Sequence, residues 1–392
     1  MKAPVSLAST ARCMSTRASR TCWESLRRSG CSFHTMTRPT PIPASMTPAN
    51  LSLATIAPTS SSGFSPSRTR PVGAGLGCDL HRISEDGGRG APNPADEMIA
   101  DLRVPEAWTR LADALSRGPR AVLVVGGADT GKSTLCRWLA GEWAQAGRDA
   151  RLVDADVGQS QLGLPATVGC ARVESAGLRD RCAFFVGDVS PRRVPAEVLG
   201  AFTEAARDAG LARLVVDSTG WVAGSEAVAL KQAKAQLLGE AHVVLVERED
   251  ELRAFRRAWR GLERFPLHVL RAAAEVRRRS PEERRQRREA AFRAHLKDAI
   301  ECEIDLRRVA VSGAGELHLP RPSAPTGLLL GLSDERGRLL SLGVLRELDA
   351  AAGRLLCRCR AEGARAAEVR LGHLLLDPEG AHRPLTVPEE AP

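Results

Sequence analysis

Tyrosine is absent from the 392-residue chain, and lysine occurs only at positions 2, 132, 231, 234 and 297. Almost all of the positive charge is therefore arginine, which we interpret as the signature of a GC-rich genome and not as adaptation to a ligand. The same bias makes Lys132 notable, because a sequence that avoids lysine has kept one inside a glycine-rich loop.

The chain also lacks a run of the ~20 apolar residues that a membrane span requires, so we expect no membrane partner. Its cysteines show no metal-type pairing, which favours a reducing, cytoplasmic protein without a disulfide framework. The net charge of +9 would attract an anionic partner at long range. A basic surface without a dedicated nucleic-acid groove explains the same charge equally well.

Residues 1–97 contain a single acidic residue, Glu24, before Asp79 and are crowded with Ser, Thr, Pro and Arg. No hydrophobic period holds there, so the segment cannot bury enough apolar surface to offset the entropy of ordering, which predicts disorder. Translation that begins near Met98 would explain it as well. An organelle transit peptide, which is also acid-poor and Arg-rich, is the third and less favoured interpretation.

From residue 98 to 304 short apolar runs alternate with helical patterns, which predicts an α/β fold with a mostly parallel sheet flanked by helices. The expected strands cover residues 121–125, 150–153, 182–186, 211–216, 241–246 and 267–270. The expected helices cover residues 134–146, 195–209, 226–238 and 251–262. A charged helical stretch follows at about 275–298, and residues 305–392 have the pattern of a small, mostly β C-terminal domain.

The segment from Gly126 to Ser133 fits the pattern G-x-x-x-x-G-K-[ST], with an expected strand before it and an expected helix after it. This context predicts a phosphate-binding loop of a P-loop NTPase whose backbone N–H groups face phosphate oxygens. Lys132 would reach the β and γ phosphates, and the Ser133 hydroxyl would bind Mg²⁺. The predicted nucleotide-binding residues are Gly126, Gly127, Ala128, Asp129, Thr130, Gly131, Lys132, Ser133 and Thr134.

Two carboxylates, Asp154 and Asp156, follow the next expected strand. Their burial at a strand end is costly unless a cation or a proton donor balances them. A bound Mg²⁺ and a substrate hydroxyl would supply both, so Asp156 is the predicted proton acceptor or metal ligand. Either carboxylate alone could instead cap the turn that follows.

Together with the loop, three further segments resemble the polynucleotide 5′-hydroxyl kinases, over roughly residues 105–380. The segments run from Asp154 to Gln159 (DADVGQ), from Ser218 to Gly224 (STGWVAG) and from Phe184 to Pro191 (FFVGDVSP). A further matching segment begins at Gly327 in the C-terminal domain. The family includes the kinase subunit of the messenger-RNA cleavage factor, the ribosomal-RNA-processing kinases and shorter archaeal and bacterial relatives.

The resemblance implies Mg²⁺-dependent transfer of the γ-phosphate of ATP or GTP to the 5′-hydroxyl of RNA or DNA. Asp156 would activate that hydroxyl, and Gln159, Thr219, Gly220 and Trp221 would bind the terminal nucleotide. An indole at a strand end can also stack on any base, and the alternative for Trp221 is simple core packing.

The Arg-rich stretch 275–298 fits the lid of this family, with eight arginines between Arg277 and Arg293. Arg284 and Arg288 are four apart on one helix face and match the lid pair, so both are predicted catalytic residues with Lys132 and Asp156. The charge run could also be a solvated face.

Two departures from the family stand out. Asp217 occupies a position where the family usually has Asn, and residues 1–97 show no pattern for the N-terminal β domain of eukaryotic members. No protein partner is therefore carried over. The alternatives are a nucleotide-binding subunit without transfer activity, and a GTPase or small-molecule kinase, which would not need Trp221.

Overall fold

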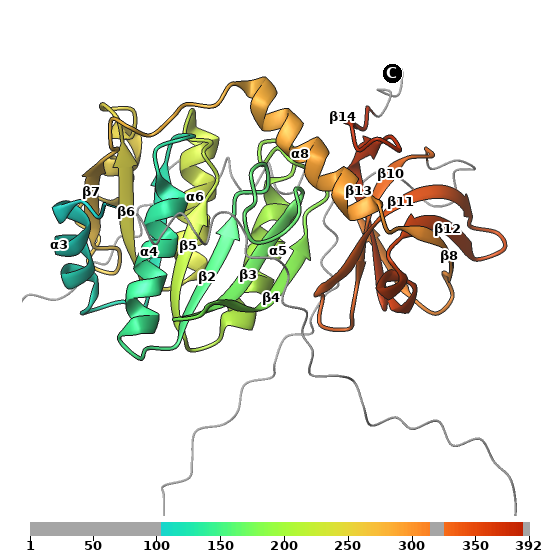
Figure 1. The fold of residues 1–392 in the computed structure, drawn as a ribbon, viewed down its shortest axis with the longest axis horizontal. Coiled ribbons are helices and arrows are strands. Elements are labelled where there is room, and N and C mark those ends of the chain that lie inside the picture. The colour runs from blue at the N-terminus through green and yellow to red at the C-terminus, as the bar shows by residue number, and fades with distance from the viewer. Residues whose placement is uncertain (1–102, 314–324, 387–392) are drawn as a thin grey trace, which may run out of the picture. The chain divides into compact units, whose positions relative to one another are not determined.

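Two β-sheets and the long helix between them make up the described part of the protein (Figure 1). The computed structural model describes residues 103–313 and 325–386, all of which belong to the unit Ser84–Pro392. The expectations for residues 1–97 lie outside these residues. Within the described ranges, no helix is long and apolar enough to cross a bilayer.

The first sheet has seven strands in the order β4-β3-β2-β5-β1-β6-β7. All neighbours are parallel except at β3, which is antiparallel to both β2 and β4. Their bounds are β1 Ala121–Gly126, β2 Ala150–Ala155, β3 Thr167–Glu174, β4 Gly177–Phe185, β5 Arg213–Ser218, β6 Ala241–Glu247 and β7 Leu267–Arg271. The mostly parallel sheet is confirmed.

The hairpin of β3 and β4 differs from the sequence-based expectation, which has no strand at 167–174 and starts the next one at 182. The first half of β4 lies at the sheet edge with Asp180 and Arg181 exposed. An edge hairpin with charged side chains does not produce the apolar run that marks a buried strand. Its position covers what would otherwise be the edge of β2.

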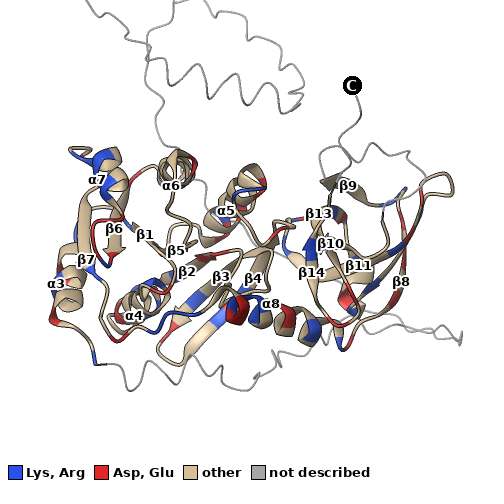
Figure 2. Ribbon diagram, turned by 90° about the horizontal axis from the view of Figure 1, so that it is seen from above, with Lys and Arg blue, Asp and Glu red and all other residues tan. Residues whose placement is uncertain are grey.

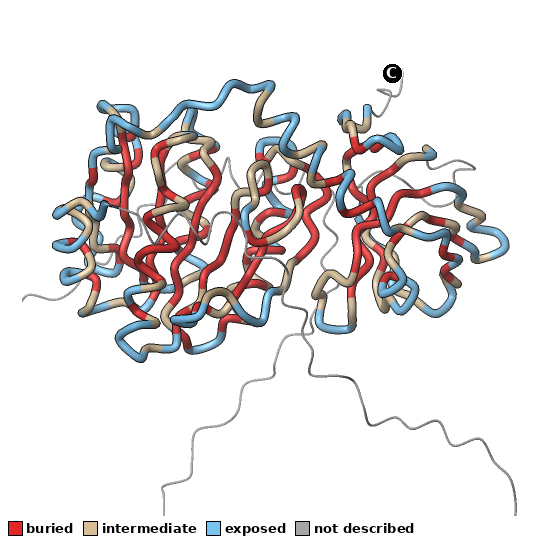
Figure 3. The backbone as a smooth tube through the Cα atoms, viewed as in Figure 1, coloured by how far each residue is buried: buried red, intermediate tan, exposed pale blue. Residues whose placement is uncertain are grey.

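Helices cover both faces of the first sheet. One face is covered by α3 (Glu106–Leu115) and α4 (Lys132–Gln145). The other face is covered by α5 (Pro195–Ala209), α6 (Ser225–Leu237) and α7 (Arg253–Trp259). Every residue of β1 and β6 is buried, as expected for central strands of a covered parallel sheet (Figure 3). The carboxyl ends of these strands form the edge where ligands bind in such folds.

The second sheet has the order β14-β13-β10-β11-β12-β8, with β9 pairing in parallel with β13. Its strands are β8 Ile300–Asp305, β9 Ala310–Gly313, β10 Leu328–Ser333, β11 Leu339–Asp349, β12 Arg354–Cys359, β13 Glu368–Leu376 and β14 His382–Pro384, with the 3₁₀ helix η1 at Ala361–Arg365. The expected β-rich C-terminal region is confirmed. Because β8 pairs with β12, the sheet begins at residue 300, and the division at 304/305 stays a prediction.

The Arg-rich segment forms α8, Pro281–Leu296, which connects the two sheets. A capping box starts it: Ser280 Oγ accepts from Glu283 N at 3.0 Å, and Glu283 Oε2 accepts from Ser280 N at 2.7 Å. Both signs of charge alternate along the helix (Figure 2). At its far end Phe292 and Leu296 pack in one apolar cluster with Phe185 of β4, so this end is fixed to both sheets.

Candidate nucleotide and acceptor site

The predicted phosphate loop lies between β1 and α4, at the carboxyl end of the sheet. Gly131 has φ 86° and Asp129 has φ 53°, so both residues adopt the left-handed backbone conformation within the loop. Thr130 Oγ1 and Lys132 Nζ both donate to Gly127 O, at 3.0 and 2.5 Å. A Cβ on Gly126 would lie 2.4 Å from Val246 O, so only glycine fits there. These contacts hold Lys132 buried inside the loop.

The two carboxylates at the end of β2 have different local roles, with Asp154 inside the strand and Asp156 directly after it. Asp154 is buried and saturated: Oδ1 accepts from Asp156 N at 3.1 Å, and Oδ2 accepts from Ser160 Oγ, Gln161 N and Leu162 N at 3.0, 2.5 and 3.1 Å. Asp154 therefore organises the loop behind the site, which matches the turn-capping alternative.

Asp156 is half-buried, and its Oδ1 accepts from Gly158 N and Gln159 N, both at 3.2 Å. It therefore caps the turn as well. Both hydrogen bonds end on Oδ1, so the other carboxylate oxygen is available for a reacting group.

Asp217, at the end of β5, is a further acidic residue beside the phosphate loop. Burial raises its pKa to about 7, with Asp154 adding to the shift and Lys132 and a hydrogen bond from Ser133 opposing it. Its Oδ1 is buried and accepts no hydrogen bond from any residue in the described ranges. A cavity of about 10 Å³, lined in part by Ser133, Asp154 and Asp217, lies next to it. A buried carboxylate oxygen without a donor is costly and marks a place for a cation.

The predicted clasp after β5 lies against the phosphate loop. A Cβ on Gly220 would come within 2.9 Å of the backbone of Ala128, so the absence of a side chain lets the two loops touch. Trp221 is half-buried on the core, and Arg192 lies over its ring at 5.6 Å from the centroid. Its Nε1 has no partner among the described residues. Trp221 thus combines core packing with a ring face that already holds a planar cation.

The start of α8 is tied to the phosphate loop by Asp129. The Asp129 carboxylate accepts from Arg279 N at 2.8 Å, Arg279 Nη1 at 3.2 Å and Arg284 Nη2 at 2.7 Å. Burial alone would raise the pKa of Asp129, but these arginine contacts outweigh it and lower the pKa below its usual value. The Arg-rich segment is therefore more than a solvated face.

The second predicted lid arginine, Arg288, is half-buried one turn further along α8. Its Nε donates to His382 Nε2 of β14 at 3.3 Å. Burial and the charge of Arg285 lower the pKa of Arg288, and the charges of Glu289 and, less strongly, Asp156 oppose this shift. Gln159 also contacts the lid, because its Nε2 donates to Arg284 O at 3.2 Å. Helix α8, the loop after β2 and the second sheet thus meet here.

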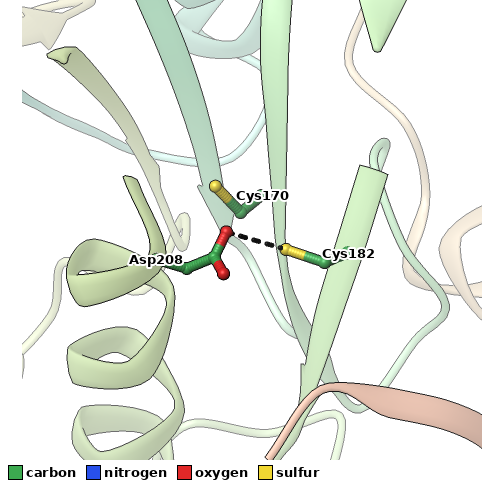
Figure 4. Close-up of side chains that lie close together, drawn as sticks. All are labelled: Cys170, Cys182 and Asp208. Atoms are coloured by element: carbon green, nitrogen blue, oxygen red, sulfur yellow. Dashed lines mark hydrogen bonds between the residues drawn. The ribbon is translucent and has the colours of Figure 1, made fainter. Parts of the chain in front are cut away.

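Cys170, Cys182 and Asp208 form a separate cluster, with ligand atoms within 4.8 Å of one another (Figure 4). Cys182 Sγ donates to Asp208 Oδ2 at 3.6 Å, and the Arg338 guanidinium binds Asp208 Oδ1. The cluster satisfies its own hydrogen bonds and ion pair, so its geometry gives no sign of a missing cation.

The sequence-based site residues thus lie around the carboxyl ends of β1, β2 and β5, whereas the sequence identifies Asp217 only as a departure from the family. Its signal was available: an acidic residue ending a buried strand next to the P-loop strand is the usual second ligand of Mg²⁺ in P-loop NTPases.

Comparisons with known proteins agree with this geometry. Residues 126–298 match the family model described as the mRNA cleavage and polyadenylation factor CLP1 P-loop. A polyribonucleotide 5′-hydroxyl-kinase of Thermococcus kodakarensis is 30% identical over 226 residues, which cover 55% of this chain and 63% of that protein. The polyribonucleotide 5′-hydroxyl-kinase Clp1 of Gallus gallus is 28% identical over 247 residues, 57% of this chain and 56% of that protein.

The chain thus covers less than two thirds of the length of these relatives. A solved structure of a wild-type Clp1p–Pcf11p complex superposes with a TM-score of 0.53 at 12% identity, covering 68% of this chain and 78% of that one, which supports the fold. Residues 126–298 of this chain are thus similar in sequence to the CLP1 P-loop family.

Proposed function

We propose that this protein transfers the γ-phosphate of ATP to the 5′-hydroxyl end of RNA. The contact of Gly220 with Ala128 carries the proposal, because it sets a base-stacking residue, Trp221, beside a phosphate-binding loop. A plain nucleotide hydrolase has no need of an aromatic clasp at that place. The printed names of the relatives, polyribonucleotide 5′-hydroxyl-kinases, support RNA as the acceptor.

In this mechanism the phosphate loop binds ATP, with Lys132 on the β and γ phosphates. Trp221 stacks on the terminal base, and Thr219, Gly220 and Gln159 line its nucleotide. Asp156 accepts the proton of the 5′-hydroxyl while the O5′–Pγ bond forms and the bond from Pγ to the bridging oxygen breaks, which releases ADP. Arg284 and Arg288 stabilise the negative charge that develops on the transferring group, an effect that can reach ~10³-fold or more.

The residues beside the loop fit a divalent cation. Ser133 and the orphaned Oδ1 of Asp217 provide oxygen ligands of the kind that Mg²⁺ prefers, with Asp156 as a further candidate. Bound there, Mg²⁺ would neutralise phosphate charge. The sequence predicts Ser133 and Asp156 as the metal ligands. If Asp217 binds the cation with Ser133, Asp156 is free to accept the proton of the 5′-hydroxyl. We also keep the expectation of a cytoplasmic protein and propose no protein partner.

The test is to incubate the full chain with γ-labelled ATP, Mg²⁺ and an RNA oligomer that carries a 5′-hydroxyl. The same RNA with a 5′-phosphate is the matched control acceptor, and a DNA oligomer and unlabelled GTP define acceptor and donor preference. We expect label on the 5′-hydroxyl RNA only. Tight binding of ATP without any labelled RNA would replace the kinase with a nucleotide-binding subunit.

A further inference from the structure

Helix α6 carries two lysines, Lys231 and Lys234, that are both completely buried. They are three residues apart and so share one helix face. Burial lowers the pKa of both side chains, that of Lys234 to about 8, and the charge of Lys234 lowers the pKa of Lys231 further. Two ammonium groups in the interior lose their solvation and repel each other, which opposes folding unless acceptors and negative charges nearby offset the loss.

Each ammonium donates to a backbone carbonyl at the base of a loop of the acceptor site. Lys231 Nζ donates to Thr219 O at 2.8 Å, and Lys234 Nζ donates to Ala155 O at 3.5 Å. The first carbonyl belongs to the peptide that enters Gly220 and Trp221, and the second to the peptide that enters Asp156. One rigid helix therefore holds the starting points of both loops.

The positive charges of the two lysines also lie close to the carboxylates of the site. The carboxylates that act on Lys234 are Asp156, Asp154 and Asp217, in that order. The lysines thus offset the acidic cluster at the ends of β2 and β5. Neither reaches the surface, so neither can touch a nucleotide or RNA directly. Their influence on a reaction must pass through the backbone and the electric field.

We propose that Lys231 and Lys234 are positioning residues that set, from one helix, the separation between the proton-accepting Asp156 and the base-stacking Trp221. The proposal rests on the function proposed above. A purely structural role is disfavoured by chemistry, because an aliphatic side chain of the same length would fill the space without the loss of solvation. Natural proteins accept such a loss of stability mainly where function requires the group.

The test uses Lys231→Met and Lys234→Met in the full chain, with Lys297→Met, which removes an exposed lysine, as the matched control. We expect both buried variants to keep or raise the Tm and to bind ATP as before. Lys231→Met should raise KM for the RNA acceptor, and Lys234→Met should lower kcat, each about 10- to 100-fold, as expected for a misplaced reacting group. Lys297→Met should match the wild type.

Hydrogen exchange of the ATP-bound proteins is the second measurement. In the Met variants the amides of residues 155–159 and 219–222 should exchange faster, while those of 126–133 stay unchanged. A lowered Tm with loss of ATP binding would make the lysines structural and overturn the proposal, as would unchanged exchange and kinetics. If the wild type transfers no phosphate, the proposed function falls, and the exchange measurement still decides whether the lysines hold the two loops.

Discussion

The carboxylate of Asp129, inside the phosphate loop, accepts a 2.7 Å hydrogen bond from Arg284 of the lid helix 155 positions later in the chain. Arg279 binds the same carboxylate. The position of the predicted lid arginine is thus set by the loop that binds the nucleotide, and not by α8 alone. The loop and the start of α8 are therefore connected directly through side chains.

Asp129→Asn should loosen this connection. Asparagine tolerates the φ of 53° at this position, so the loop keeps its shape while the charge is removed. Charge-assisted hydrogen bonds contribute about 1.5–3 kcal/mol each, so amide exchange of residues 279–284 should accelerate about tenfold or more. ATP affinity should not fall, because a negative charge beside the phosphates is lost. Glu282→Gln, on the exposed side of α8, is the control, and equal exchange in both variants would contradict the account.

Asp156→Asn should abolish phosphate transfer and leave ATP affinity largely intact. The amide cannot accept the proton of the 5′-hydroxyl, yet its oxygen can still accept from Gly158 N and Gln159 N and so keep the turn. Single-turnover transfer and equilibrium ATP binding are the two measurements. A parallel loss of both would identify Asp156 as a metal ligand instead of a base.

Arg288→Ala should lower kcat by up to ~10³-fold with a smaller change in the KM for ATP, because the guanidinium stabilises charge that develops during transfer. Arg287→Ala is the matched control, since Arg287 is the neighbouring residue on the exposed side of α8. The measurement is kcat and the KM for ATP of both variants, from steady-state kinetics. A rate equal to that of the wild type would remove Arg288 from the catalytic part of the lid.

Asp217 should make stability depend on pH in a definite direction. Its pKa of about 7 in the folded protein lies above the value of about 3.9 expected in the unfolded chain, so the folded state binds more protons between pH 4 and 7. The contribution of this group to stability is therefore present at low pH and is lost as the pH rises toward 7. Asparagine does not titrate, so Asp217→Asn does not lose this contribution as the pH rises. The Tm of the variant relative to that of the wild type should therefore increase from pH 4 to pH 7 and stay constant above pH 7.

The same Tm measurements with Mg²⁺ present test Asp217 as a metal ligand. A cation favours the ionised carboxylate, so Mg²⁺ with ADP should raise the wild-type Tm more at pH 8 than at pH 5. The Asp217→Asn protein should show little of this difference. The same pH slope and the same response to Mg²⁺ in both proteins would exclude Asp217 from the metal site.

The sequence predicted the fold well where local patterns decide it. The phosphate loop, the alternation of buried strands with helices and the charged helix α8 follow from short-range chemistry. The β3–β4 hairpin was missed because its edge strand carries charges where a buried strand carries apolar residues.

The site was predicted less completely, because several of its relationships depend on tertiary structure. Asp129 matches only an unspecified position of the loop pattern, and its partners come from a distant helix. Lys231 and Lys234 look like ordinary surface residues of an amphipathic helix in the sequence, whereas the fold buries both completely. Their one signal was compositional: two of the rare lysines occur three residues apart.

The most direct test of the central claim is the chemical position of the transferred phosphate. The full chain is incubated with γ-labelled ATP and 5′-hydroxyl RNA, and the recovered RNA is digested to 5′-mononucleotides. Our account predicts that the label is found in the 5′-monophosphate of the terminal nucleoside and is absent when Asp156→Asn replaces the wild type. Label only in inorganic phosphate, or equal labelling by Asp156→Asn, would contradict it.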